Sequence, residues 1–272
     1  MTILLSIKAV KRIMVIAVFS VFATAIQAQN WEAGGWIGTA HYFGDLNPNY
    51  DFGQGELAAG VIARYNFNQR LAVKFGGNYG NISASDAMSQ DIFQRNRNLS
   101  FRSEMLEGNL NFEFNFLTYE HGSEFQRFTP YIFAGLSLFS FNPEAQLDGV
   151  WYDLQPLGTE GQFRGQEYDL TQVAVNYGAG FKVDLNFDWS LNIFISSRRL
   201  FTDYLDDVST VYADPGDLEE IRNEIAKALA DRSLNNSGIP GNQRGNSQNN
   251  DAYAFIGLGL VYNFARIDCP WF

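Results

Sequence analysis

The sequence predicts an all-β fold, an eight-stranded antiparallel transmembrane β-barrel. Three observations lead to this prediction. Apolar and polar residues alternate through eight segments, and the connections between these segments are alternately long and short. Beyond the first 30 positions, the chain has no apolar run of about 20 residues, the length that a spanning helix requires. Aromatic residues make up 15% of the chain, which suits a barrel with a lipid-facing belt.

The alternation is clearest in segment 172–186, where Val173, Val175 and Tyr177 share one face and polar residues or glycines occupy the other. The eight segments are 31–42, 56–67, 70–81, 106–116, 130–141, 172–186, 189–200 and 254–264. A strand tilted by about 45° crosses a bilayer in roughly 9–11 residues, whereas strands of soluble sandwiches usually have about 5–6. Most of the segments have the membrane-spanning length.

The connections sort into two sets. The short ones are 68–69, 117–129 and 187–188, and the long ones are 43–55, 82–100, 142–171 and 201–251. Membrane barrels have short periplasmic turns and long outer loops, so both ends of the barrel are expected in the periplasm. Aromatic residues cluster at the expected periplasmic strand ends, as in a girdle that contacts outer-membrane lipids.

The first 28 residues read as a cleaved secretory signal peptide. Lys8, Lys11 and Arg12 precede an apolar stretch, and Ala28 offers a small residue for cleavage. An uncleaved anchor helix is the alternative. Cleavage leaves 16 Lys and Arg against 30 Asp and Glu, a net charge of −14, which argues against a nucleic-acid partner. The expected organisation is therefore signal peptide 1–28, barrel 29–266 and periplasmic tail 267–272.

Charged residues on the polar strand faces should point into the lumen, which in a barrel of eight strands is just wide enough for its own side chains. They are four acids and four bases, namely Glu32, Glu107, Glu113, Asp184, Arg64, Lys74, Lys182 and Arg198. Charges in a low-dielectric interior need partners. A sealed, salt-bridged plug is therefore expected, with a small ion path as the alternative.

The search for catalytic chemistry yields little. A nucleophile–histidine–acid triad would need His41 or His121, the two histidines of the chain. His41, followed by Asp45, could serve a membrane-surface acyl transferase, but an interfacial histidine at a strand end is the simpler interpretation. For His121 no partner can be named. Two separate histidines and one cysteine also argue against a transition-metal cluster, so neither a cofactor nor a catalytic residue is expected.

An acidic motif follows the seventh segment. Its residues are Asp203, Tyr204, Asp206 and Asp207, and Asp45 joins them as the expected outer-rim motif. Such carboxylates could bind calcium, but the spaced EF-hand pattern is missing, and a hydrogen-bonded rim is the alternative.

A helix is expected in the last long loop. The string Asp217-Leu218-Glu219-Glu220 resembles a capping box. Leu218, Ile221, Ile225 and Leu229 then share one face of a single helix that continues to about residue 232. An apolar stripe must cover something, either the barrel mouth or a partner protein.

The single cysteine lies in the tail, at Cys269. Because the periplasm is oxidising, an unpaired cysteine there suggests an intermolecular disulfide or a reactive thiol. A buried, inert terminal thiol is the alternative.

Several strings resemble one known family. They are YFGDLNP (42–48), FTDYLDDVSTVY (201–212) and AYAFIGLGLVYNF (252–264), which is followed by CPWF (269–272). Together they are similar to PorG-like barrels, outer-membrane components of the type IX secretion system of Bacteroidetes. The resemblance implies association with a periplasmic ring made of a PorK/GldK-like lipoprotein and its PorN/GldN-like partner. It also implies a role in protein export and, in gliding species, proximity to the motility apparatus.

The expected function is accordingly a non-enzymatic scaffold that anchors the secretion ring to the outer membrane. Cys269, Pro270, Trp271 and Phe272 are the expected contacts with the ring lipoprotein, which Cys269 could hold by a disulfide. A small barrel that binds or passes a solute is the alternative from another class. A membrane-surface enzyme that depends on His41 is a third possibility.

Overall fold

The structure is a computed structural model that describes residues 30–121, 123, 125–235 and 238–264. The expected signal peptide 1–28 and the tail 267–272, with Cys269, Pro270, Trp271 and Phe272, lie outside the described residues.

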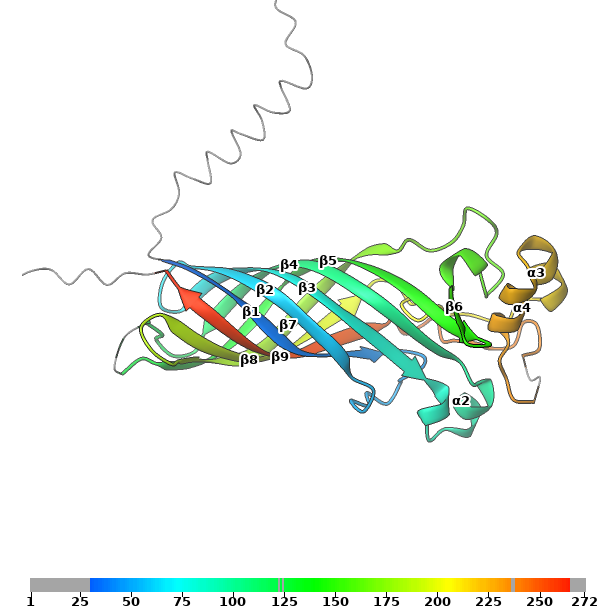
Figure 1. Cartoon of the computed structure of the whole chain (residues 1–272), viewed down its shortest axis with the longest axis horizontal. Helices are drawn as coiled ribbons and strands as arrows, with labels where there is room; N and C mark the ends of the chain where they lie inside the picture. Colours follow the sequence, from blue (N-terminus) through cyan, green and yellow to red (C-terminus); the bar gives the residue numbers. More distant parts are fainter. Residues whose placement is uncertain (1–29, 122, 124, 236–237, 265–272) are drawn as a thin grey trace, which may run out of the picture.

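Eight antiparallel strands form a closed barrel, which confirms the predicted fold class (Figure 1). They are β1 (Trp31–Phe43), β2 (Glu56–Asn66), β3 (Leu71–Ser85), β4 (Ser100–Asn115), β5 (Phe128–Leu147), β7 (Thr171–Asp184), β8 (Trp189–Leu200) and β9 (Ala252–Asn263). The first and last strands pair with each other, and the pairing of β4 with β5 completes the ring. A ninth, short strand, β6 (Val150–Asp153), pairs with the far end of β5.

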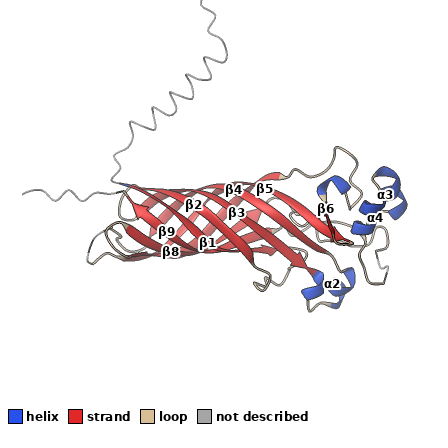
Figure 2. Cartoon of the chain, in the orientation of Figure 1, coloured by secondary structure: helices blue, strands red, loops and turns tan. Residues whose placement is uncertain are grey.

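The two ends of the barrel differ, as Figure 2 shows. At the short-turn end lie the connections β2–β3, β4–β5 and β7–β8, the start of β1 and the end of β9. At the long-loop end lie β6 and the helices η2 (Asp86–Met88), α2 (Ile92–Arg97), η3 (Gln155–Leu157), α3 (Pro215–Ile221) and α4 (Glu224–Ala230). The connections from β3 to β4, from β5 to β7 and from β8 to β9 therefore carry their additional structure to the same side.

The strand alternation separates a lipid-type face from an interior face. Outward side chains such as Ile37 (70% exposed), Leu57 (79%) and Phe112 (66%) form an apolar belt. Inward side chains between them are buried, and they include both charged and aromatic residues. Because each of the eight barrel strands has two neighbours, the backbone hydrogen-bonding groups within the barrel wall are paired without a free edge, as a membrane-spanning sheet requires. None of the helices in the described ranges is both long and apolar enough to cross a membrane.

Three strands extend further toward the long-loop end than the hydrophobic pattern predicts. β3 continues to Ser85, β4 begins at Ser100, and β5 continues to Leu147. The outward residues of these extensions are polar while the inward ones are apolar, as with Ser83 and its neighbour Ile82. The pattern therefore inverts where the wall leaves the apolar belt, although strand pairing continues.

The helix expected from residue 217 to about 232 is wrong as a single element. The chain forms α3 and α4, separated at Arg222, whose φ of −117° and ψ of −88° are not helical. Asp214, not Asp217, caps α3, and Pro215 begins it. Asn223 caps α4 by accepting a hydrogen bond from the Ala226 amide.

Candidate functional site

Five charged side chains form one network in the lumen near the short-turn end. Arg64 on β2 places Nη1 2.5 Å from Glu32 Oε2 and Nε 2.7 Å from Glu113 Oε2. Lys74 Nζ lies 3.1 Å from Glu113 Oε1, and Lys182 Nζ lies 2.7 Å from Glu113 Oε2. None of these side chains is more than 8% exposed. A water-filled passage would leave such charges in contact with solvent, so the lumen is filled around them.

A second network lies further along β4 toward the long-loop end. Arg198 donates from Nε and Nη2 to the two oxygens of Glu107, at 2.8 and 2.9 Å. Tyr253 and Asn78 also donate to Glu107, at 2.6 and 2.7 Å, and Trp36 Nε1 donates to Asn78 at 2.9 Å. Each oxygen of this buried carboxylate is thus satisfied, as a stable buried charge requires.

Aromatic rings separate and line the two networks. Lys74 Nζ lies 4.1 Å from the ring centroid of Phe133, a favourable position over a π face. Trp36 packs edge-on against Phe194 with centroids 5.3 Å apart. Further inward rings continue toward the long-loop end, namely Phe139, Phe141, Tyr253 and Phe255. The interior is consequently a packed core with embedded ion pairs.

Asp184 finds a partner that the sequence did not suggest. Its Oδ1 lies 2.8 Å from Nδ1 of His121, whose Nε2 lies 2.8 Å from Glu32 Oε1. Tyr119 also donates to Asp184. Asp184 thus lies in the lumen as expected, but its partner is an imidazole and not one of the four expected bases, because the β4–β5 connection folds inward.

His121 closes the short-turn end electrostatically. Burial disfavours its charged form, but the carboxylates of Asp184 and Glu32 outweigh that cost and raise the pKa of His121 to about 9. The unusual length of its connection, compared with the two-residue turns, is the sequence signal that could have indicated an inward fold.

Three parts of the chain meet at the mouth around Tyr42, near the end of β1. Its hydroxyl lies 2.5 Å from Asp206 Oδ2 and 3.0 Å from Asp251 Oδ1. Asp251 accepts from the Leu205 amide at 2.8 Å, and Asp206 accepts from the Val208 amide at 2.9 Å. Burial, first of all, and the neighbouring carboxylates raise the pKa of both aspartates well above the ordinary value. A proton is therefore retained between them to higher pH than on an exposed aspartate.

Two buried arginines hold the surrounding loops. Arg244 donates to the carbonyls of Asp207 (2.6 Å) and Ala230 (3.2 Å), and it pairs with Glu160 at 3.1 Å. Arg97 donates to the Arg244 carbonyl at 2.6 Å. Arg97 also holds Asp86 through two nitrogens, at 2.7 and 2.8 Å. We call these side chains the rim clasp, defined as Tyr42, Asp206, Asp207, Asp251, Arg97 and Arg244.

The expected outer-rim motif is spread over this clasp. Asp207 accepts from Thr159 at 2.5 Å and Tyr168 at 2.7 Å, and burial raises its pKa to about 6. Asp45 Oδ2 accepts from the Asn246 amide at 2.8 Å. The ring of Tyr204 stacks on Tyr168 with centroids 4.9 Å apart.

Asp203 is largely buried near this clasp, and burial raises its pKa to about 7. In the described part of the chain, no three acidic, histidine or cysteine side chains are grouped as metal ligands would be. The sequence analysis did not predict Tyr42, Asp251, Arg97 and Arg244 as rim residues. Buried acidic side chains require cations as partners, so the arginines of the long loops were the residues that the sequence could have indicated.

His41 does not join Asp45. Its Nε2 contacts Thr39 Oγ1 at 2.9 Å, and its ring packs against Phe52 with centroids 5.1 Å apart. Asp45 instead bonds to Asn246. The structure therefore does not assemble the pair that a His41-dependent enzyme would need.

The two short helices cover the mouth. Leu218, Ala226, Leu229 and Ala230 are buried, and Leu229 belongs to the apolar cluster that continues into the barrel. Arg222, at the break between the helices, donates to the carbonyls of Pro156 and Gln162 at 2.9 and 2.8 Å. The apolar stripe thus packs on the chain's own loops, above the rim clasp.

The closed sheet, the apolar outer belt and the filled lumen define a small outer-membrane β-barrel. The chain belongs to the family described as domain of unknown function DUF6089, whose model matches residues 11–222. No curated protein matches the sequence.

Similar solved structures are small barrels of low sequence identity. Neisserial surface protein A is 9% identical with a TM-score of 0.44, and the match covers 86% of this chain and 96% of that one. OprG from Pseudomonas aeruginosa is 12% identical with a TM-score of 0.45, at the same coverages. The attachment invasion locus protein Ail of Yersinia pestis is 10% identical with a TM-score of 0.39, covering 86% of this chain and 98% of that one.

Proposed function

We propose that this chain is a non-enzymatic outer-membrane barrel that anchors a periplasmic protein assembly. The observation that carries the proposal is the lumen, in which buried ion pairs and aromatic rings leave their charged groups at most 8% exposed. A barrel filled in this way offers its two ends and its outer face for interactions, and its interior stabilises the fold.

The assembly is the ring of the type IX secretion system, made of a PorK/GldK-like lipoprotein and a PorN/GldN-like partner. The support is the resemblance carried by residues 42–48, 201–212 and 252–264. The short-turn end then faces the periplasm, as in other membrane barrels with short turns on that side. The tail with Cys269, Pro270, Trp271 and Phe272 follows β9 at this end and is the proposed contact with the ring lipoprotein.

Two of the strings behind the resemblance meet physically. Tyr42 opens the first string, and Asp206 lies in the second, and the two side chains share a hydrogen bond of 2.5 Å. Asp251, the residue before the third string, contacts the same hydroxyl at 3.0 Å. The first two strings therefore meet in the rim clasp, which suits a family that shares a closed mouth.

Affinity purification tests the proposal. An affinity tag inserted after Gln248, an exposed loop residue, leaves the short-turn end unmodified. Purification from solubilised outer membranes followed by mass spectrometry should recover the ring lipoprotein and its partner. Recovery of the barrel alone, under conditions that preserve the ring, would refute an anchoring role.

Tail variants locate the contact. Truncation after residue 267 should reduce recovery of the ring lipoprotein about tenfold or more, since terminal aromatic anchors commonly dominate binding energy. Cys269→Ser separates a disulfide from non-covalent docking, because only a disulfide gives a reductant-sensitive complex on gels. Glu219→Gln, an exposed substitution at the other end of the barrel, is the matched control and should leave recovery unchanged.

A further inference from the structure

A groove on the outside of the barrel wall lies directly beyond the apolar belt. Tyr79 on β3 pairs with Leu106 on β4, and both point outward with 51% and 63% exposure. The next three outward cross-strand pairs are polar: Asn81 with Glu104, Ser83 with Arg102, and Ser85 with Ser100. Because the hydrocarbon of the membrane ends where the outward face becomes polar, this surface lies at the level of lipid headgroups and beyond.

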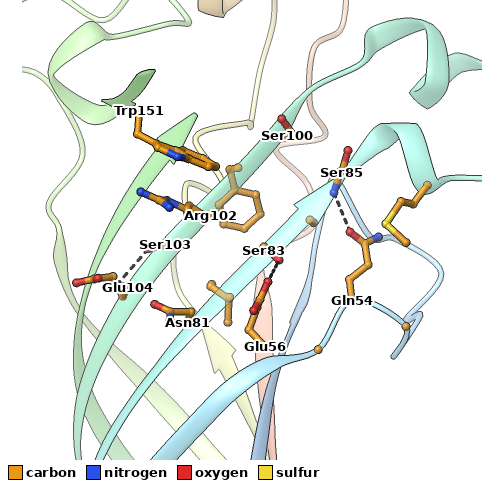
Figure 3. Close-up of a pocket in the computed structure, with 16 residues that line it drawn as sticks. Gln54, Glu56, Asn81, Ser83, Ser85, Ser100, Arg102, Ser103, Glu104 and Trp151 are labelled. Carbon is orange, nitrogen blue, oxygen red and sulfur yellow. Dashed lines mark hydrogen bonds between the residues drawn. The ribbon is translucent and has the colours of Figure 1, made fainter. Parts of the chain in front are cut away.

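The polar surface is hollowed because β2 and β3 extend to different distances from the apolar belt. The last pair between β2 and β3 is Ala58 with Gly80, so β3 continues past β2 to Ser85. The segment 53–56 forms one wall of the resulting cavity and Trp151 of β6 forms the other, as Figure 3 shows. The cavity has a volume of about 690 Å³. This volume lies within the range of small-molecule sites, roughly 300–1,000 Å³.

The aromatic wall is held in place. The guanidinium of Arg102 lies 3.6 Å from the ring centroid of Trp151 and pairs with Glu144 at 2.7 Å. The indole remains 40% exposed and borders the cavity. It thus offers a rigid apolar surface at small entropic cost.

The floor of the groove offers both hydrogen-bond donors and hydrogen-bond acceptors. Gln54 Oε1 accepts from the Ser85 amide at 2.9 Å, and Glu56 Oε1 accepts from Ser83 Oγ at 2.8 Å, which fixes both side chains beside the groove. Within the described part of the chain, the side chains of Asn81 and Glu104 have no hydrogen-bond partner, and both line the cavity (Figure 3). They are available for a ligand.

The charge of the groove selects against anions. Glu56 and Glu104 line it, and the charge of Arg102 is already neutralised by Glu144. Arg232 donates to Ser100 at 2.9 Å but does not line the cavity. A phosphate or sulfate would meet surplus negative charge, whereas a neutral ligand rich in hydroxyl groups would find carboxylate and amide acceptors.

We propose that this groove binds a saccharide. A pyranose has an apolar C–H face that can pack on the part of the Trp151 indole that the Arg102 guanidinium leaves exposed. Its hydroxyl groups can donate to Glu104 and exchange hydrogen bonds with Asn81 and Gln54. The glycan could belong to a lipid of the same membrane leaflet or to a soluble oligosaccharide, and the chemistry recognised is the same. The proposal does not depend on the secretion role.

Binding measurements with the full mature barrel in detergent micelles test the site. The probes are lipopolysaccharide from the bacterium that produces this protein and the lipid-free polysaccharide that mild acid releases from it. Trp151→Ala should weaken binding of at least one probe about tenfold, and Glu104→Gln should weaken it severalfold. Trp189→Ala is the matched control, since Trp189 has a similar exposure of 38% but lies at the short-turn end, and it should bind as the wild type does.

The outcomes separate the sources and can overturn the proposal. Binding of both probes with loss in Trp151→Ala supports glycan recognition itself, and binding of the intact lipid alone assigns the ligand to the membrane. Glu104→Gln alters an exposed side chain, so it remains informative if Trp151→Ala fails to fold, which heat-modifiable gel mobility reports. Binding of neither probe, equal loss in Trp189→Ala, or competition by millimolar inorganic phosphate would each refute a saccharide site.

Discussion

At the scale of single residues, Glu113 is the carboxylate that all three cations of the lumen network share. Three cations contact this one carboxylate, with distances of 2.7 Å to Arg64, 3.1 Å to Lys74 and 2.7 Å to Lys182. Burial of three positive groups without it would be costly, because a buried charge that loses its partner keeps its desolvation penalty.

Glu113→Gln should therefore destabilise the barrel by about 3–5 kcal/mol, the usual cost of breaking a buried ion pair from one side. Urea unfolding of the refolded barrel, followed by gel mobility, measures this loss. Glu219→Gln removes an exposed ion pair with Lys227, 2.6 Å long, and should change stability by no more than about 1 kcal/mol. Equal effects of the two substitutions would show that the lumen charges are not stabilising.

His121 makes the closure of the short-turn end dependent on pH. Its pKa rises from an ordinary 6.5 to about 9 in the folded protein, because Asp184 and Glu32 outweigh the cost of burial. The stabilisation is complete below pH 6.5 and is lost as the pH rises through about 9. Its size is at most about 3 kcal/mol.

Unfolding midpoints of wild type and His121→Gln, measured between pH 6 and 10, check this prediction. The difference between the two proteins should be largest at pH 6 and should shrink toward pH 10. Taking the difference removes the titration of the other groups. A difference that does not change with pH would contradict a charged His121 at the plug.

At the scale of elements, the long connection from β8 to β9 behaves as a cap that two arginines fasten. Arg244 reaches the carbonyls of Asp207 and Ala230 and the carboxylate of Glu160, so one side chain joins three segments. The helices α3 and α4 then lie over the mouth without belonging to the barrel sheet.

Arg244→Ala should loosen this cap while the sheet stays folded. Limited proteolysis should cleave the 201–251 connection about tenfold faster than in wild type, since the open fraction rises tenfold for each 1.4 kcal/mol of lost stabilisation. Arg95→Ala is the matched control, because Arg95 is exposed and, among the residues that the structure describes, its side chain donates only to the carbonyls of Ser89 and Gln90. Cleavage within the strands would indicate global unfolding instead.

The strands could be predicted from the sequence because lipid and lumen impose opposite polarity on successive residues. The strand ends on the long-loop side could not be predicted. Outside the membrane, Ile82 and Phe101 point inward while Ser83 and Arg102 point outward, so the apolar outward face that lipid imposes is missing there. The break between α3 and α4 depends on Arg222 reaching carbonyls more than fifty residues away, so no local pattern marks it.

The inward charges could also be predicted, because buried charges must pair, but their partners could not. Arg64 on β2 reaches Asn192 on β8 at 3.1 Å, a contact set by the curvature of the closed wall. His121 was missed because it lies in a connection, and strand alternation says nothing about a turn that folds back into the lumen.

At the scale of the whole molecule, three closures follow one another along the barrel. His121 and Asp184 join the Glu113 network through Glu32 at the short-turn end, the Glu107 network comes next, and the rim clasp closes the mouth. Because the closures lie in series along the lumen, one intact closure is enough to block the passage of an ion, whatever the state of the others.

This arrangement predicts a barrel without steady conductance. The wild type in planar bilayers should give no stable current under conditions in which a 16-stranded porin, with its aqueous channel, conducts. Arg244→Ala and His121→Gln, singly or combined, should stay closed because the Glu113 and Glu107 networks lie between the two ends. Adding Glu107→Ala and Glu113→Ala removes the pairs that these two carboxylates make and should give intermittent currents from a less stable protein. Large, steady currents through the wild type would overturn the filled-lumen interpretation and favour a barrel that passes a solute.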